Sequence, residues 1–203
     1  VFADFRPTLD DYQARVPYLF LANIDPELQL QVLRQMRTRP RLVALDTMNF
    51  WIKGKREALM RVLREVDLIT INDGEARQLA EEPNLIKAAR RIAALGPRTV
   101  VVKRGEYGAL LLDGDQFFVV PAYPLEAVFD PTGAGDTFAG GFLGYLAGAM
   151  ASERATSPSD EALRRAVVMG SALASFCVEA FSLDRLLTLT RPEIDERFRL
   201  FKR

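Results

Sequence analysis

The residues of this chain that are best suited to chemistry lie in the segment "DPTGAGDTFAGG", residues 130–141. Gly133 and Gly135 can adopt positive φ, and neither places a Cβ in the way of an incoming group. If a helix begins near residue 134, the amides at its positive end are unpaired donors, which favours an anion. The carboxylate of Asp136 would repel a phosphate, so its presence here needs a reason. It makes sense if Asp136 is a base that accepts the proton of an attacking hydroxyl, as phosphoryl transfer requires. The alternative is that Asp136 caps the helix and the glycines only turn the chain.

The known phosphate-binding motifs do not match this segment. The sequence contains no Gly-Lys-Ser or Gly-Lys-Thr, so a P-loop is excluded. The dinucleotide fingerprint fails as well, because Phe138 stands where its third glycine belongs and no strand leads directly into the turn. An NAD-dependent oxidoreductase is therefore disfavoured.

Composition narrows the function classes further. The 203 residues are 49% hydrophobic, and 27 basic residues balance 27 acidic ones, so neither a nucleic-acid partner nor a membrane surface is indicated. The absence of histidine excludes Ser-His-Asp and Cys-His catalysis and nearly all zinc sites. Cys177 is expected to be a buried small hydrophobe, and a single cysteine fits a cytoplasmic protein. The longest apolar stretch, 138–150, is too short to span a membrane.

The elements that must position the glycine turn follow from hydrophobic periodicity. Short apolar strands alternate with amphipathic helices, which is typical of βαβ units and a parallel sheet. The expected strands are 18–22, 41–46, 67–72 and 98–105, and the expected helices are 25–36, 55–66, 73–82 and 84–96. Beyond them we expect a hairpin at 107–123, a helix from about 134, a loop at 151–160, a helix within 157–181 capped by Ser159, and a tail helix from 191.

Gly140, Gly144 and Gly148 recur on one face of the expected helix after the turn. Because glycine costs about 1 kcal/mol against alanine inside a helix, we expect these three to pack closely against a neighbouring backbone. The whole chain, residues 1–203, is expected to form one α/β domain.

Three ordered segments resemble the ribokinase-like, or PfkB, family of carbohydrate and nucleoside kinases. "DPTGAGDTFAGGFLGYL" is similar to the family's C-terminal signature, "NDGEA" (72–76) to its N-x-x-E element, and "VVKRGEYGALLL" (101–112) to its strand with a G-x-x-G turn. The resemblance implies a three-layer α/β sandwich with a mostly parallel central sheet. It also implies that the chain corresponds to the C-terminal two-thirds of a member, without the N-terminal lid.

The resemblance assigns roles around the turn. It implies that Asp136 is the catalytic base and that the amides of Gly133, Ala134 and Gly135 form the anion hole for the γ-phosphoryl group of ATP. Loss of such donors typically raises a barrier by a few kcal/mol.

The same resemblance implies that Asn72 and Glu75 organise Mg²⁺, largely through water, which suits an ion that takes few direct protein ligands. The local alternative is a capping box, in which Asn72 caps a helix and Glu75 completes it. Both interpretations can hold together.

Lys103, Gly105 and Gly108 correspond to residues that pass close to ATP in the family. The alternative for the two glycines is an ordinary turn between strands. Met169 and Ala172, with Val119 and Val120, are candidates for the adenine pocket, although apolar residues at such spacing are more often core.

Asp130 and Thr132 match a segment that contributes to a monovalent-cation site in many relatives. The partner segment "FCVEAFSLD" lacks the glycine that relatives commonly have there, and this departure weakens the expectation of K⁺ activation.

The resemblance therefore implies an ATP- and Mg²⁺-dependent cytoplasmic kinase that phosphorylates a hydroxyl of a sugar or nucleoside. The missing lid would exclude water and could support a homodimer. The competing hypothesis is a catalytically silent nucleotide-binding or sensor module of the same fold.

Overall fold

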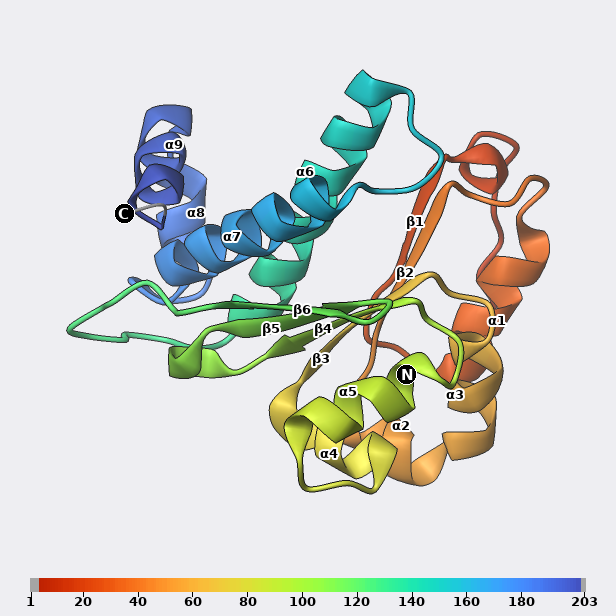
Figure 1. The fold of residues 1–203 in the computed structure, drawn as a ribbon. Coiled ribbons are helices and arrows are strands. Elements are labelled where there is room, and N and C mark those ends of the chain that lie inside the picture. Colours follow the sequence, from red (N-terminus) through yellow and green to blue (C-terminus); the bar gives the residue numbers. More distant parts are fainter. Residues whose placement is uncertain (1–3, 202–203) are drawn as a thin grey trace. The chain divides into compact units, whose positions relative to one another are not determined.

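The structure, a computed structural model, describes residues 4–201 and has an α/β fold (Figure 1). Its strands form a six-stranded, mostly parallel sheet in the order β1-β2-β3-β4-β5-β6. The strands are β1 (Tyr18–Leu21), β2 (Leu42–Asp46), β3 (Leu68–Asn72), β4 (Thr99–Lys103), β5 (Ala109–Asp113) and β6 (Gln116–Val120). The helices are α1 (Pro26–Gln35), α2 (Asn49–Gly54), α3 (Arg56–Leu63), α4 (Asp73–Ala80), α5 (Leu85–Ala93), α6 (Ala134–Glu153), α7 (Asp160–Cys177), α8 (Asp184–Thr188) and α9 (Arg191–Leu200), with short 3₁₀ turns η1 (Gln13–Arg15) and η2 (Gly105–Tyr107).

The alternation expected from the sequence is confirmed, and so is the hairpin of β5 and β6 around Gly114. Two helices were missed. Both α2 and α8 are too short for a 3.6-residue period to show in the sequence. The expected loop at 151–160 begins later than predicted, because α6 continues to Glu153. Among residues 4–201, no helix combines the length and the hydropathy that a membrane span needs.

The chain divides into two compact units. Unit 1 comprises Val1–Val102 and Leu112–Gln116, and unit 2 comprises Lys103–Leu111 and Phe117–Arg203. We expected one domain over residues 1–203, and that expectation stays a prediction.

Unit 1 is built on strands that are apolar along their whole length. Val43, Ala44 and Leu45 of β2 are fully buried, as strands of a covered parallel sheet require. Leu21 of β1 pairs with Leu45, and Asp46 pairs with Thr70 of β3, both in parallel register. Parallel pairing brings the carboxyl ends of β1, β2 and β3 to one edge of the sheet, the edge where α/β proteins bind ligands.

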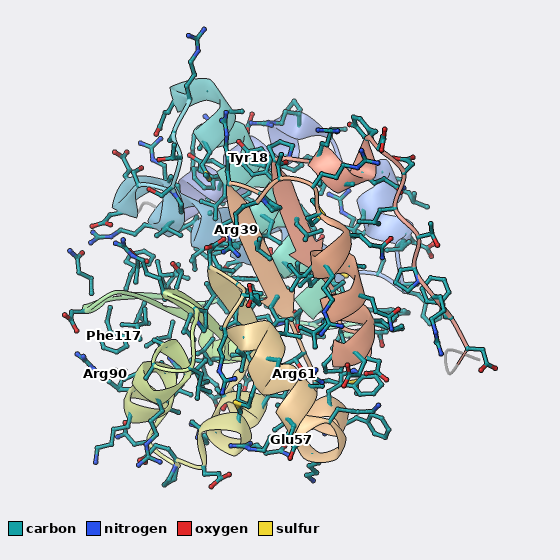
Figure 2. All side chains as sticks on the ribbon, turned by 90° about the vertical axis from the view of Figure 1, so that its right-hand side faces the viewer. Tyr18, Arg39, Glu57, Arg61, Arg90 and Phe117 are labelled. Carbon is teal, nitrogen blue, oxygen red and sulfur yellow. The ribbon has the colours of Figure 1, made fainter. Side chains whose placement is uncertain are left out.

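The helices of unit 1 have one buried and one exposed face. On α3, Leu59 and Val62 are fully buried, whereas Glu57 and Arg61 lie on the exposed face (Figure 2). Asp25 caps α1 by accepting the amide of Glu27 at 3.0 Å, as its position before Pro26 predicts. Capping and amphipathicity therefore act together in this unit.

An ion pair and a hydrogen bond to the same carboxylate link the amino-terminal ends of the same strands. Arg39, labelled in Figure 2, donates to Oδ1 of Asp67 at 2.8 Å, while Oδ2 of Asp67 accepts the amide of Val43 at 2.8 Å. These groups satisfy one another at the amino-terminal edge of the sheet.

Unit 2 is organised around the packing of α6 on α7. A Cβ on Gly141 would lie 3.3 Å from the Cα of Gly170, and a Cβ on Gly170 would lie 2.8 Å from the carbonyl oxygen of Phe138. Only glycine permits such an approach of two helices.

The prediction that Gly140, Gly144 and Gly148 provide this close packing was wrong. All three are exposed, and a Cβ on any of them would meet no atom within 4 Å. The helical rotation of about 100° per residue turns Gly141, with the buried Phe138 and Phe142, toward the partner helix instead.

Candidate active site

The glycine turn leads into α6 as predicted. Gly133 is the N-cap residue and takes the left-handed conformation, with φ of 80°, which glycine adopts without strain. The first α-helical bond runs from the amide of Thr137 to the carbonyl oxygen of Gly133 at 2.8 Å. No side chain caps the helix, so the interpretation of Asp136 as a cap finds no support in the hydrogen bonds.

The amides of the turn are not all available. The amide of Ala134 donates to the carbonyl oxygen of Pro131 at 3.2 Å, which closes the turn. Within residues 4–201, the amides of Gly133, Gly135 and Asp136 have no acceptor. Three donors therefore remain at the positive end of α6, where an anion is favoured.

A cation lies directly beside these donors. Lys103 ends β4, and a Cβ on Gly135 would lie only 3.3 Å from its Nζ atom. Glycine at position 135 thus leaves room for an ammonium group next to the free amides. A helix terminus and a lysine side chain together attract a phosphate more strongly than either does alone.

Asp136 lies in the first turn of α6, and its side chain is exposed. In the part of the chain that the structure describes, its carboxylate takes part in no hydrogen bond or ion pair. A first-turn carboxylate with no structural partner retains all its lone pairs for a proton or a ligand.

The end of α7 holds the turn in place. The carbonyl oxygen of Val178 accepts the amide of Phe129 at 2.8 Å, and the Sγ atom of Cys177 donates weakly to the carbonyl oxygen of Thr132 at 3.7 Å. Cys177 is buried, as predicted, with 1% of its surface exposed. Sequence reasoning missed its contact with the turn, because the two segments are far apart in the chain.

Asp130 fastens the turn from its other side. Its carboxylate accepts the amide of Thr132 at 2.9 Å and the amide of Ser182 at 3.2 Å. The hydrogen bonds from Thr132, and then that from Ser182, lower the pKa of Asp130 below its ordinary value. Each carboxylate oxygen of Asp130 has a backbone partner, so the side chain stabilises the loop conformation in this structure.

The two glycines of the G-x-x-G turn differ in role. Gly108, with φ of 82°, is buried, and a Cβ there would lie 2.0 Å from the carbonyl oxygen of Val120. Gly105, with φ of 54°, is exposed, and a Cβ there would meet nothing within 4 Å. An ordinary turn between strands therefore explains the glycine at position 108. At Gly105, by contrast, the backbone is exposed to solvent.

The predicted adenine-pocket residues of α7 belong to the core in this conformation. Ala172 is 0% exposed and Met169 is 9% exposed. Val120 is also buried, and Val119 is exposed. A contact of Met169 or Ala172 with a nucleotide stays a prediction.

Asn72 and Glu75 lie at the carboxyl end of β3 in unit 1. The Oδ1 atom of Asn72 accepts the amide of Glu75 at 2.8 Å, and the Oε2 atom of Glu75 accepts the amide of Asn72 at 3.1 Å. The capping box is thus formed at the start of α4. Amide and carboxylate oxygens are suitable acceptors for the water shell of Mg²⁺, so the chemistry of the pair fits an outer-sphere role. Among residues 4–201, no group of three or more acidic or cysteine side chains could hold a metal directly.

Comparisons with known proteins identify the family of the chain. A model of the pfkB family carbohydrate kinases matches residues 18–188. A cytidine kinase of Thermococcus kodakarensis is 36% identical over 133 residues, which cover 63% of this chain and 47% of that protein. A nucleoside kinase of Methanocaldococcus jannaschii is 26% identical over 163 residues, which cover 79% of this chain and 48% of that protein. The chain spans about half the length of these curated relatives.

Solved structures show the same fold. A crystal structure of the Methanocaldococcus jannaschii nucleoside kinase aligns with a TM-score of 0.73 at 22% identity, covering 98% of this chain and 60% of that one. A fructokinase from Vibrio cholerae aligns with a TM-score of 0.76 at 18% identity, covering 95% of this chain and 62% of that one. Since the family model matches well over half of its residues, this protein belongs to the pfkB family of carbohydrate kinases.

Proposed function

We propose that the protein is part of a kinase that transfers the γ-phosphoryl group of ATP to a hydroxyl group of a sugar or nucleoside. Asp136 takes the proton of the acceptor hydroxyl. The amides of Gly133, Gly135 and Asp136 stabilise the charge that develops on the transferred group, and Lys103 adds a positive charge beside them.

One observation carries this proposal. The exposed Asp136 carboxylate has no structural partner among the described residues, although it stands in a helix turn whose free amides would suit an anion. A plain structural turn has no use for a negative charge there, except through the helix dipole, which contributes only about 0.3–1 kcal/mol. A general base explains both the residue type and its exposure.

The family and the residues of unit 1 support ATP and Mg²⁺ as the proposed cofactors. Asn72 and Glu75 would hold hydrated Mg²⁺ through water while they keep the capping box. The ion would supply charge neutralisation on the phosphates. Gly105, whose backbone is open, is the better candidate of the G-x-x-G turn for an approach to the nucleotide.

The Mg²⁺ role can be separated from the capping role by substitution. Glu75→Gln retains an oxygen that accepts the amide of Asn72, so we expect it to preserve stability while raising the Mg²⁺ concentration required for half-maximal activity. Glu75→Ala should lower both stability and Mg²⁺ affinity. Equal Mg²⁺ dependence of the wild type and Glu75→Gln would restrict Glu75 to capping.

The relatives support a proposal for the acceptor class. A cytidine kinase and two nucleoside kinases are among the curated matches, and a deoxyribokinase is another. We therefore propose a nucleoside or a pentose as acceptor. Transfer of ³²P from [γ-³²P]ATP to a panel of nucleosides and sugars would test this, with Mg²⁺ omitted as the control.

The competing proposal is a catalytically silent nucleotide-binding module, which is motivated by a chain that spans about half of its curated relatives. Saturable ATP binding without labelled product on any acceptor would favour that module. Acceptor-dependent product that disappears in Asp136→Asn would exclude it.

Dependence on a monovalent cation is a separate question. Asp130 already binds two backbone amides, so we propose that K⁺ is not required at this turn. Replacement of K⁺ by Na⁺ at constant ionic strength should leave the rate unchanged, and a strict K⁺ requirement would contradict this proposal.

A further inference from the structure

Unit 1 contains a cavity of about 330 Å³ among the segments that follow the carboxyl ends of β1 and β2. Ile24, Asp25 and Leu28 line it from the segment after β1, and Trp51 and Lys55 line it from the segment after β2. Small-ligand pockets begin near this volume, and they combine apolar walls with a few polar groups. This cavity has both, because the charged Arg6 and Glu27 and the amide of Gln31 line it in addition to Asp25 and Lys55.

The indole of Trp51 is held in a fixed orientation. Its Nε1–H donates to the Oδ1 atom of Asn23 at 3.0 Å, which connects α2 to the loop after β1. The ring of Phe50 meets it edge-on, with centroids 4.8 Å apart and planes at 82°. A preoriented aromatic ring loses little conformational entropy when a ligand stacks on it.

The fold does not require this aromatic pair. Ile52 anchors α2 in the core with 2% of its surface exposed, whereas Phe50 is 62% exposed. Trp51 is only partly buried. Large aromatic side chains on a short helix at the ligand-binding edge of a sheet are therefore more than packing residues.

The polar groups of the cavity suit the edge of a flat ring. The Oδ2 atom of Asp25 lies 3.5 Å from the Nζ atom of Lys55, so an acceptor and a donor stand side by side. The indole of Trp51 and the aliphatic side chains of Ile24 and Leu28 in the lining favour a ring with apolar faces. A sugar can stack only through its C–H groups, whereas every nucleobase has a π-face as well as a polar edge.

We propose that Trp51, with the Asp25–Lys55 pair, binds the heteroaromatic base of a nucleoside acceptor. This assignment rests on the proposed kinase function and deepens it, because it makes a nucleoside rather than a free sugar the preferred acceptor. Trp51 stacks on the base, while Asp25 and Lys55 bind its edge.

The protein offers a built-in probe, since the chain has one tryptophan. Titration with cytidine, uridine, adenosine and guanosine should quench or shift the Trp51 fluorescence in a saturable way for at least one nucleoside. Free ribose at the same concentrations should leave the emission unchanged. A response to ribose equal to that of every nucleoside, or no response to any nucleoside, would overturn the assignment.

Substitution of Trp51 provides the second test. Nucleoside affinity is then measured by calorimetry, because the substitution removes the fluorophore. Base stacking on an aromatic ring is worth roughly 1–3 kcal/mol, so Trp51→Leu should weaken nucleoside binding by roughly 5- to 150-fold. Trp51→Phe keeps a ring and should retain most of the affinity even if Trp51→Leu folds poorly. Tyr12→Leu, which removes an 81% exposed ring elsewhere in unit 1, is the matched control and should bind normally.

The two proposals fail in different ways. If Trp51→Leu phosphorylates a nucleoside with an unchanged KM, base recognition by Trp51 is wrong and the kinase proposal stands. If the wild type binds nucleosides through Trp51 but transfers no phosphate, the kinase proposal is wrong and base recognition is supported.

Discussion

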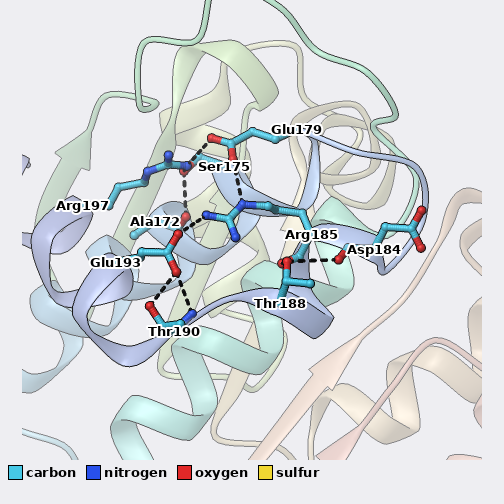
Figure 3. A network of polar contacts seen from close by, with 9 residues as sticks. All are labelled: Ala172, Ser175, Glu179, Asp184, Arg185, Thr188, Thr190, Glu193 and Arg197. Carbon is cyan, nitrogen blue, oxygen red and sulfur yellow. Dashed lines mark hydrogen bonds and ion pairs between the residues drawn. The ribbon is translucent and has the colours of Figure 1, made fainter.

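Unit 2 contains two charged regions that differ in whether their polar groups have partners. At the start of α6, the Asp136 carboxylate and the amides of Gly133, Gly135 and Asp136 have no partners among the described residues. Near α8 and α9, by contrast, four of the charged side chains in Figure 3 bind one another: Arg185 and Arg197 both pair with Glu179, and Arg185 also pairs with Glu193. The first region contains polar groups without partners, whereas the second pairs its charged groups with one another.

Burial explains why the second region is closed. Only 13% of the Arg197 side chain is exposed, and its guanidinium lies 3.4 Å from the ring centroid of Phe176 and 4.4 Å from that of Tyr123. A charge between two rings is kept only if its hydrogen bonds are made, and Arg197 donates to Ser175 at 3.0 Å and pairs with Glu179 at 2.7 Å. The two regions differ in unused hydrogen-bonding capacity rather than in charge, and this capacity distinguishes the proposed active site.

The largest expected effect comes from Asp136→Asn. A general base typically contributes a factor of about 10²–10⁴, so we expect kcat to fall by that range while stability stays the same. Asp160→Asn is the matched control, because Asp160 is an exposed aspartate in the first turn of α7. Initial rates of ADP formation with a saturating acceptor measure the effect, and near-normal turnover of Asp136→Asn would refute its role as base.

The next effect concerns the space beside Lys103. Gly135→Val places side-chain atoms against the Nζ atom of Lys103 and shields the free amides, so we expect kcat to fall by about 10²–10³. ATP binding, measured by calorimetry, should weaken much less. Gly140→Ala is the control, because its Cβ would meet no atom within 4 Å; it should keep full activity and gain up to about 1 kcal/mol of stability. Equal losses of ATP affinity and kcat in Gly135→Val would place the defect in binding.

The glycine turn was predictable from sequence because its residue types are local signals. Positive φ at Gly133, the start of α6 at Ala134 and the capping box of Asn72 all depend on neighbours within a few residues. The alternation of strands and helices was predictable for the same reason, since hydrophobic period is a local property.

What the sequence did not show depends on tertiary contacts. The choice of Gly141 over Gly140 for the helix crossing depends on which face of α6 meets α7. The contact of Cys177 with Thr132 and that of Lys103 with Gly135 each join distant segments. The same holds for the placing of Trp51 against Asn23. No periodicity or motif encodes which distant residues meet.

The closed region should respond in stability rather than in rate. Arg197→Met keeps an apolar stem between the rings of Phe176 and Tyr123 but removes the cation and its bonds to Glu179 and Ser175. We expect the free energy of unfolding to fall by about 1–3 kcal/mol, from lost cation–π and charge-assisted hydrogen bonds. Arg199→Met, at an exposed position of α9, is the control and should change stability by less than about 0.5 kcal/mol. Urea unfolding measures both, and an unchanged midpoint for Arg197→Met would show that the network contributes nothing.

The smallest effect concerns Glu193, whose pH dependence tests whether the closed region is fastened by charge. The hydroxyl of Thr190, then Arg185 and the amide of Thr190, hold the pKa of Glu193 at about 2, below its ordinary 4.5. A carboxylate with a lowered pKa in the folded state stabilises the fold above the unfolded value, and this contribution is lost as the pH falls from about 4.5 toward 2. In Glu193→Gln that part of the acid sensitivity should be missing, so the stability difference from the wild type should shrink over this interval. Glu196→Gln, at an exposed position of the same helix, should follow the wild-type profile. Because Glu193 is itself partly exposed, salt should weaken its effect on stability. Identical acid profiles of the wild type and Glu193→Gln would show that its ion pair contributes nothing measurable to stability.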